Sequence, residues 1–143
     1  MLWDLFQRKG IESAEPNANI TLGRKGEDLA VRFLCTEGYK VLYRNYRAPK
    51  GGEVDIVCRE KTSRTLVFVE VKTRSSLDFG APSDAVNREK QRLITRGAFA
   101  WLRMLDNPDI VFRFDIVEVV MQESGPALSV IRDAFSLPEP YIY

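Results

Sequence analysis

The 143-residue sequence contains no histidine. This absence excludes Ser-His-Asp and Cys-His catalysis and every metal site built on imidazole ligands. The two cysteines, Cys35 and Cys58, form no C-x-x-C pair and are too few for a thiolate zinc cage or a disulfide framework. They favour free thiols in a reducing cytoplasm. If the protein is an enzyme, carboxylates and lysines must carry its chemistry.

Long hydrophobic runs are also missing. The uninterrupted apolar stretches span only a few residues, whereas a membrane-spanning helix needs about 20. The first residues, Met-Leu-Trp-Asp-Leu-Phe, contain an acid and lack the continuous apolar segment of a secretory signal. We therefore expect a cytoplasmic protein that does not associate with a membrane.

An excess of charge of either sign is absent, because 21 Lys and Arg residues are balanced by 20 Asp and Glu residues. The total charge thus does not indicate a nucleic-acid-binding protein, and the distribution of the charges has to decide. The length and the 45% apolar content favour one globular domain, over residues 21–143. Residues 1–20 are predicted to form an N-terminal appendage, either a flexible tail with a docking patch or a dimer contact.

The pattern of hydrophobic residues predicts two helices and five strands. The helices are expected over 21–37 and 87–105, and the strands over 39–46, 53–59, 65–73, 111–121 and 128–132. The order α-β-β-β-α-β-β predicts a three-layer α/β domain, in which helices flank a mixed central sheet. The strand over 111–121 is expected in the interior of the sheet. The connection over 75–86 is long for a compact domain and could gate a site or contact a partner subunit.

Charged residues interrupt the apolar face of the third predicted strand. Alternation along this strand places Val67, Val69 and Val71 on one face. Glu70 and Lys72 then share the other face with apolar side chains. Burying such charges costs several kcal/mol per ion unless they are paired or bound to a cation.

The preceding strand repeats this arrangement. There Val54 and Ile56 are expected on one face, and Asp55 on the other. Strands joined by a hairpin are usually neighbours, so Asp55 would lie beside Glu70 and Lys72. Glu27 flanks the apolar stripe of the first helix, so it could bring a third carboxylate to the same corner of the sheet.

Carboxylates without imidazole form the ligand set of Mg²⁺, a hard cation that favours phosphate substrates. An ion held by Asp55 and Glu70 could polarise a phosphodiester, and Lys72 could stabilise the charge that develops. Two other interpretations stay open. Glu70 and Lys72 could form a simple ion pair at the end of the strand, or the four residues could be a purely structural ion network.

Several segments together resemble a known family: Gly26-Glu27-x-x-Ala30, Asn45-Tyr-Arg47, Gly52-Glu-Val-Asp-Ile56, Phe68-Val-Glu-Val-Lys-Thr-Arg74, Lys90-Gln-Arg92, Phe114-Asp-Ile116 and Asp133-Ala-Phe135. They are similar to the YraN-like family of small bacterial proteins. That family is related to the archaeal Holliday junction resolvases within the PD-(D/E)xK nuclease superfamily. The resemblance runs in order from about residue 21 to residue 135.

The resemblance implies a restriction-endonuclease-like fold and a metal-dependent endonuclease acting on branched or structured DNA. By it, Asp55 and Glu70 correspond to the two acids of the motif, Lys72 to its lysine, and Glu27 to the glutamate on the helix. The implied cofactor is Mg²⁺, for which Mn²⁺ can substitute, held by Asp55, Glu70 and Glu27. The Glu53 carboxylate and the backbone carbonyl of Val71 are candidates for further ligands.

The resemblance also implies a homodimer, because resolvases cut symmetric junctions as dimers. In one position the sequence departs from the family pattern, since Val54 stands where the motif's name has proline. An alternative function is a non-catalytic nucleic-acid-binding or adaptor module on the same fold.

Basic residues flank the four predicted site residues in the sequence. Candidates for contacts with nucleic-acid phosphates are Arg47, Lys50, Arg74 and Lys90. For the basic residues at the start of the second helix, a solvated helix face is an equally good interpretation. Because no segment resembles a base-reading motif, we expect recognition through shape and phosphate contacts.

Overall fold

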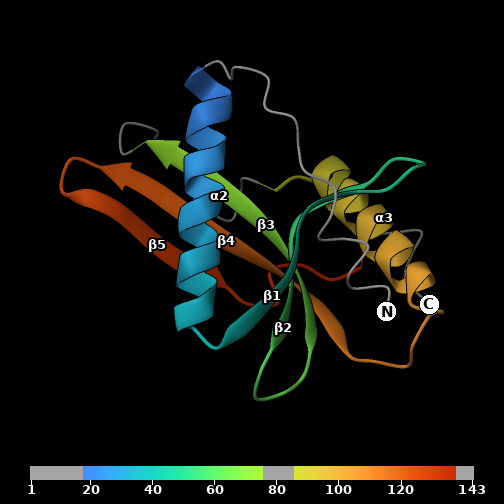
Figure 1. Ribbon diagram of the computed structural model, residues 1–143. Helices are drawn as coiled ribbons and strands as arrows, with labels where there is room; N and C mark the ends of the chain where they lie inside the picture. The colour runs from blue at the N-terminus through green and yellow to red at the C-terminus, as the bar shows by residue number, and fades with distance from the viewer. Residues whose placement is uncertain (1–17, 76–85, 138–143) are drawn as a thin grey trace.

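The order of the elements agrees with the prediction from the sequence. A computed structural model describes residues 18–75 and 86–137 of the chain (Figure 1). Its elements are α2 (Ala18–Thr36), β1 (Tyr39–Arg47), β2 (Glu53–Glu60), β3 (Leu66–Ser75), α3 (Arg88–Met104), β4 (Phe112–Gln122) and β5 (Gly125–Ile131). Most of the predicted appendage and of the predicted gating loop lies outside the described residues.

The five strands form one mixed sheet in the order β1-β2-β3-β4-β5. Neighbouring strands are antiparallel except β3 and β4, which are parallel and are connected through α3. The predicted hairpin between β2 and β3 is confirmed, with Ile56 opposite Val69. β4 lies between β3 and β5, in agreement with the interior position expected from its apolar sequence.

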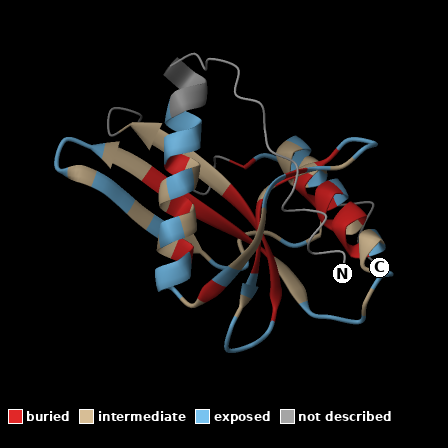
Figure 2. Ribbon diagram, in the orientation of Figure 1, coloured by how far each residue is buried: buried red, intermediate tan, exposed pale blue. Residues whose placement is uncertain are grey.

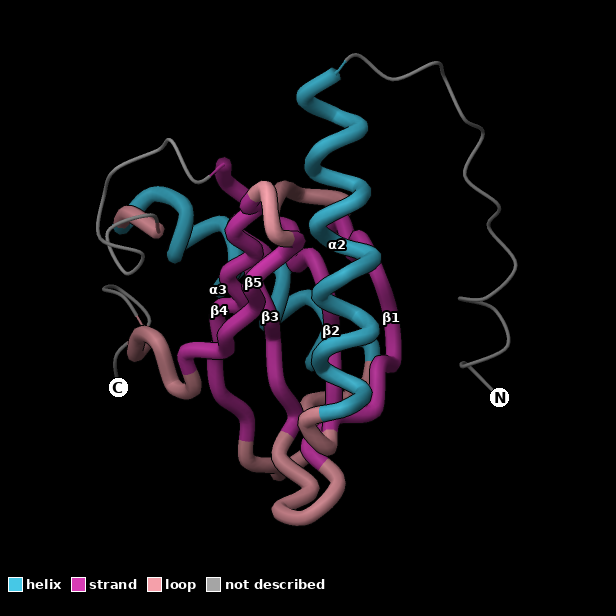
Figure 3. The backbone as a smooth tube through the Cα atoms, turned by 90° about the vertical axis from the view of Figure 1, so that its left-hand side faces the viewer, coloured by secondary structure: helices cyan, strands magenta, loops and turns pink. Residues whose placement is uncertain are grey.

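The two helices cover opposite faces of the sheet, so the three-layer prediction is confirmed (Figures 1 and 3). On one face, α2 packs Ala30 and Leu34 against a cluster that includes Val67 and Val69. On the other face, Ile94 and the other buried residues of α3 pack against a second cluster. Figure 2 shows these buried positions as red segments on the sheet and on the inner sides of both helices.

The alternation of side chains is confirmed for β3 and corrected for β2. Leu66 and Phe68 join the cluster under α3, on the face predicted for Glu70 and Lys72, whereas Val67 and Val69 face α2. Val54 and Ile56, expected on one face, instead pack into different clusters. The pairing of β2 with β3 ends at Ile56, between these two residues, whereas the ladder between β1 and β2 continues through Arg44–Ile56 and Tyr46–Val54.

The ends of the elements follow from local residue types. Gly38 has a φ of 87°, as expected for the glycine that ends a helix. The side chain of Asn87 accepts a hydrogen bond of 2.9 Å from the backbone N–H of Lys90 and so caps α3. β5 begins at Gly125, three residues earlier than predicted, because a tight hairpin at Gly125 lets the strand pair with β4 at once.

No helix in the described ranges is long and apolar enough to span a membrane.

Candidate active site

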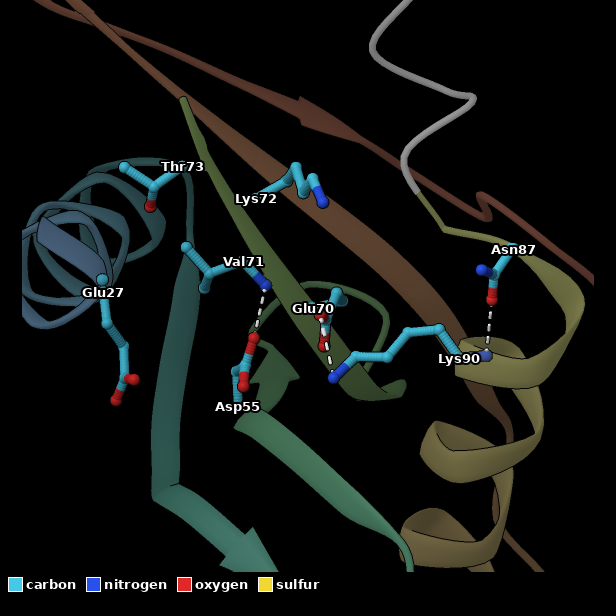
Figure 4. Close-up of a pocket in the computed structure, with 9 residues that line it drawn as sticks. Glu27, Asp55, Glu70, Val71, Lys72, Thr73, Asn87 and Lys90 are labelled. Carbon is cyan, nitrogen blue, oxygen red and sulfur yellow. Dashed lines mark hydrogen bonds and ion pairs between the residues drawn. The ribbon is translucent and has the colours of Figure 1, made fainter. Parts of the chain in front are cut away.

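All four predicted site residues line one cavity of about 550 Å³ beside β3. Glu27 comes from α2, Asp55 from β2, and Glu70 and Lys72 from β3 (Figure 4). The remaining lining residues are Gly23, Val71, Thr73, Asn87 and Lys90. Residues far apart in the sequence therefore meet at one corner of the sheet, as the alternation of β3 and the β2–β3 hairpin predict.

Asp55 and Glu70 form the centre of the cavity. The backbone N–H of Val71 donates a hydrogen bond of 2.8 Å to Oδ2 of Asp55, which fixes that carboxylate against β3 (Figure 4). Glu70 is only 7% exposed. Its Oε2 atom is buried and has no hydrogen-bond partner among the described residues. A buried, unpaired carboxylate oxygen is costly, so this atom requires a ligand, a proton or a water.

The electrostatic environment disfavours two negative charges at this point. Burial, together with the neighbouring Asp55 carboxylate, raises the pKa of Glu70 to about 8. Burial also raises the pKa of Asp55, although the hydrogen bond from Val71 opposes this effect. Without a bound metal ion, the pair therefore retains a proton near neutral pH.

Another buried acid of the same sheet shows that this fold can fully satisfy a carboxylate. Asp115 on β4 is completely buried and accepts hydrogen bonds from the Tyr39 hydroxyl at 2.9 Å and from Nε of Arg113 at 3.0 Å. The backbone N–H of Asp133 donates a third bond, of 2.9 Å. The unpaired oxygen of Glu70 is thus a local feature of the cavity rather than a general property of this sheet.

Glu27 is held in place by a close contact between α2 and β3. A Cβ atom at Gly26 would lie 1.9 Å from Oγ1 of Thr73, so only glycine allows the helix to approach this closely. Oε1 of Glu27 accepts hydrogen bonds from Nδ2 of Asn45 at 2.8 Å and from Nε of Arg44 at 3.2 Å. Burial raises the pKa of Glu27, whereas Arg44 opposes the rise.

Lys90 has a position that the sequence analysis did not foresee. It was predicted to contact phosphate, but its Nζ forms an ion pair with Glu53. The same Nζ lies 3.5 Å from Oε1 of Glu70 (Figure 4). The bond from Lys90 lowers the pKa of Glu53. The predicted further ligand Glu53 is therefore engaged by a lysine, and Lys90 is an internal counter-ion of the acidic cluster.

Lys72 differs from Lys90 in having no such partner. No hydrogen bond or ion pair joins its ammonium group to the residues that the structure describes. Figure 4 shows its side chain leaving β3 on the side of α3, in the same cavity as Glu70. The ammonium group is thus available to a ligand.

The other predicted phosphate contacts occupy different environments. Arg47 and Lys50 are exposed at the end of β1 and in the turn that follows. Arg74 is half-buried and forms an ion pair of 3.1 Å with Glu118. Of these, only Lys90 lines the cavity that holds the acids.

The donor set of the cavity suits a hard divalent cation. Asp55 and Glu70 supply carboxylate oxygens, and the unpaired Oε2 of Glu70 provides an unused ligand atom. No group of three Asp, Glu, His or Cys side chains that could hold a metal occurs in the described part of the chain. Two carboxylates fit Mg²⁺ nevertheless, because this ion usually keeps several of its waters.

Comparisons with known proteins identify a family to which the chain is similar. Residues 26–119 match the uncharacterised protein family UPF0102. A UPF0102 protein of Geobacter metallireducens is 44% identical over 119 residues, which cover 83% of this chain and 95% of the relative. A UPF0102 protein of Pelobacter propionicus is 41% identical over 132 residues, which cover 92% of this chain and 93% of the relative. A UPF0102 protein of Caldicellulosiruptor saccharolyticus is 46% identical over 116 residues, which cover 80% of this chain and 96% of the relative.

These matches confirm the resemblance inferred from the sequence motifs. The family match begins at Gly26 and ends at Val119, so it includes every residue that lines the cavity except Gly23. The chain belongs to the UPF0102 family, also called the YraN family.

Proposed function

We propose that this protein is a divalent-cation-dependent endonuclease that hydrolyses phosphodiester bonds in branched or otherwise structured DNA. One observation carries the proposal: Asp55 and Glu70 lie side by side in a cavity, with Oε2 of Glu70 buried and unpaired. A divalent cation satisfies both carboxylates at once. The resemblance of the motif residues to the PD-(D/E)xK nucleases supports the same conclusion.

In this proposal Asp55 and Glu70 hold Mg²⁺ or Mn²⁺ through their carboxylate oxygens. When bound, such an ion polarises a phosphodiester and lowers the pKa of a water molecule. The bond from the N–H of Val71 keeps Asp55 in one orientation, so the site loses little conformational entropy on binding. The carbonyl of Val71 stays a predicted ligand.

Lys72 and Glu27 have distinct roles. The ammonium group of Lys72 stabilises the negative charge that develops on the phosphate in the transition state. Glu27 enters from the other side of Asp55 (Figure 4), where Arg44 and Asn45 hold its carboxylate. From this position it can orient a water molecule that attacks phosphorus or completes the shell of the ion.

The start of α3 adds a surface that suits the anionic substrate. Asn87 and Lys90 of its first turn line the cavity, and the N-terminus of a helix favours anions. A phosphate in the cavity can attract Lys90 away from Glu70, which leaves that carboxylate free for the cation. The homodimer implied by the resemblance would supply two such sites for the two strands of a junction.

The alternative, a non-catalytic nucleic-acid-binding or adaptor module, has its own supporting observation. Lys90 places a positive charge beside Glu53 and Glu70 from within the chain, and the raised pKa of Glu70 keeps this acid protonated near neutral pH, so a divalent cation is not required to balance their charge. Under this alternative the protein binds DNA in a salt-sensitive manner without cleavage, and Asp55→Ala changes the binding little.

The two functions are separated by a cleavage assay with matched variants. The purified protein is incubated with a four-way junction, a flap and a linear duplex, with Mg²⁺ or Mn²⁺ and with EDTA. We expect the metals to support nicking of the branched substrates, and Asp55→Asn and Lys72→Ala to abolish it while the thermal unfolding stays cooperative. Arg59→Ala, an exposed residue of β2 outside the cavity, is the control. Equal cleavage by all variants would indicate a contaminating nuclease and refute the proposal.

A further inference from the structure

A second cavity, also of about 550 Å³, lies between the C-terminal half of α3 and the turn that joins β1 to β2. Tyr46 and Phe99 supply aromatic surface, and Lys50, Arg96 and Arg103 contribute basic groups. No acidic side chain of the described residues lines it. Its chemistry is therefore the opposite of that of the cavity holding Asp55 and Glu70.

No carboxylate among the described residues neutralises the basic groups of this second cavity. Arg44, Arg74, Lys90 and Arg113 each form an ion pair with a carboxylate. In contrast, Lys50, Arg96 and Arg103 have no ion-pair partner in the part of the chain that the structure describes. Three unpaired cations around one apolar hollow favour a ligand that carries both a negative charge and a flat apolar surface.

The walls of the second cavity are fixed by the packing of the turn on the helix. A Cβ atom at Gly52 would lie 2.6 Å from the backbone nitrogen of Gly97 and 2.8 Å from Cβ of Arg96, so only glycine lets the turn pack this closely on α3. The turn is closed by a hydrogen bond of 2.9 Å from the N–H of Ala48 to the carbonyl of Gly52. The Tyr46 ring packs edge-on against Trp101, with centroids 5.3 Å apart. The hollow is thus formed before any ligand binds.

The same helix connects the two cavities. Lys90 contributes to the acidic cavity, and Arg96 and Arg103 to the second one. With a rise of 1.5 Å per residue, these arginines lie about 9 and 20 Å along the helix axis from Lys90. A stacked strand advances about 3.4 Å per nucleotide. Because each residue also turns the helix by about 100°, Arg96 and Arg103 lie about 120° and about 140° round the axis from Lys90. A strand cut in the first cavity would therefore have to pass round α3 to reach the second one.

We infer that the second cavity binds an unstacked base of a nucleic-acid strand, together with its phosphate, next to the site of cleavage. This inference rests on the proposed function, because it takes the substrate to be a nucleic acid. The base stacks on the aromatic surface, and Arg96, Arg103 and Lys50 contact the adjacent phosphates. The cavity thus selects substrates with unpaired nucleotides over continuous duplexes.

Binding of labelled DNA measured by fluorescence anisotropy tests this inference without cleavage, with Ca²⁺ in place of Mg²⁺. A forked DNA with single-stranded arms is compared with a fully paired duplex of equal length. We expect Phe99→Leu, which keeps an apolar side chain against Phe112, to weaken binding of the forked DNA at least fivefold and that of the duplex less than twofold. An equal effect on both DNAs would overturn the inference.

A charge-matched comparison isolates the contribution of the arginines. The double variant Arg96→Ala/Arg103→Ala is expected to lose about tenfold in affinity for the forked DNA. The control Arg88→Ala/Arg92→Ala removes the same charge from the same helix outside both cavities and is expected to lose less than threefold. An equal loss in the two double variants would overturn the inference.

These results separate the inference from the proposed function. If the protein prefers forked DNA through Phe99 but no metal supports cleavage, the second cavity is assigned correctly and the nuclease proposal fails. If the protein cleaves DNA while Phe99→Leu binds the forked DNA like the unaltered protein, the inference fails and the nuclease proposal stands.

Discussion

Replacing Glu70 by glutamine should make the metal-free protein more stable at alkaline pH. The variant keeps the shape of the side chain but removes a buried charge beside Asp55. In the folded protein the pKa of Glu70 is about 8, compared with 4.5 for an ordinary glutamate. The native state thus binds more protons than the unfolded chain between these pH values. The free energy of unfolding must therefore fall as the pH rises from 4.5 to about 8.

The size of the effect follows from this difference in pKa. A shift of this extent corresponds to roughly 5 kcal/mol once the group is ionised. Part of the gain is lost in the variant, because Lys90 keeps only Glu53 as a partner and the new amide needs acceptors. We therefore expect Glu70→Gln to raise the free energy of unfolding by about 2 kcal/mol at pH 8.5 and by about zero at pH 5.

The assay is urea unfolding followed by circular dichroism in EDTA at pH 5 and pH 8.5. The matched control is Glu53→Gln, which also removes a partner of Lys90. The pKa of Glu53 is lowered by its bond to Lys90, so its charge is stabilising and the control should destabilise the protein at pH 8.5. If Glu70→Gln destabilises the protein as the control does, the Glu70 charge is stabilising and the acids form a structural ion network.

Three further predictions address individual contacts of the site. In differential scanning fluorimetry at pH 8, 10 mM Mg²⁺ should raise the melting temperature of the unaltered protein by several degrees but leave that of Asp55→Asn unchanged. An equal rise in both proteins would show that the ion binds elsewhere. Lys90→Met should lower the melting temperature more in EDTA than in Mg²⁺, because the metal ion replaces the lost counter-ion of Glu70. An equal decrease in melting temperature with and without the metal would contradict this role of Lys90. Gly26→Ala should lower the free energy of unfolding by about 2 kcal/mol in urea, since the new methyl group meets Thr73. Adding Thr73→Ala should restore part of this loss. If the effects of the two substitutions on the free energy of unfolding simply add, the two residues do not interact.

The core of the candidate site could be predicted from the sequence because it depends on short-range rules. Alternation along β3 places Glu70 and Lys72 on one face, and a hairpin brings Asp55 next to them. Helical spacing places Glu27 beside the apolar stripe that packs on the same sheet. Each step uses a period of 2 or 3.6 residues or a connection of a few residues.

Other features depend on contacts that no local pattern reveals. Lys90 reaches Glu53 and Glu70 because the first turn of α3 lies over the end of β3, which is a consequence of the tertiary packing. Asn45 has a positive φ, and its side chain donates a hydrogen bond to Glu27, although the sequence around it is that of a regular strand. An asparagine inside a predicted strand is the one signal that could have indicated this irregularity.

The most direct test of the central claim, that Asp55 and Glu70 together bind a divalent cation, is an anomalous-scattering map from crystals soaked in Mn²⁺. We expect a peak about 2 Å from a carboxylate oxygen of each residue, with Nζ of Lys90 displaced from Glu70. A map without a peak between these carboxylates, in which Lys90 still contacts Glu70, would contradict it.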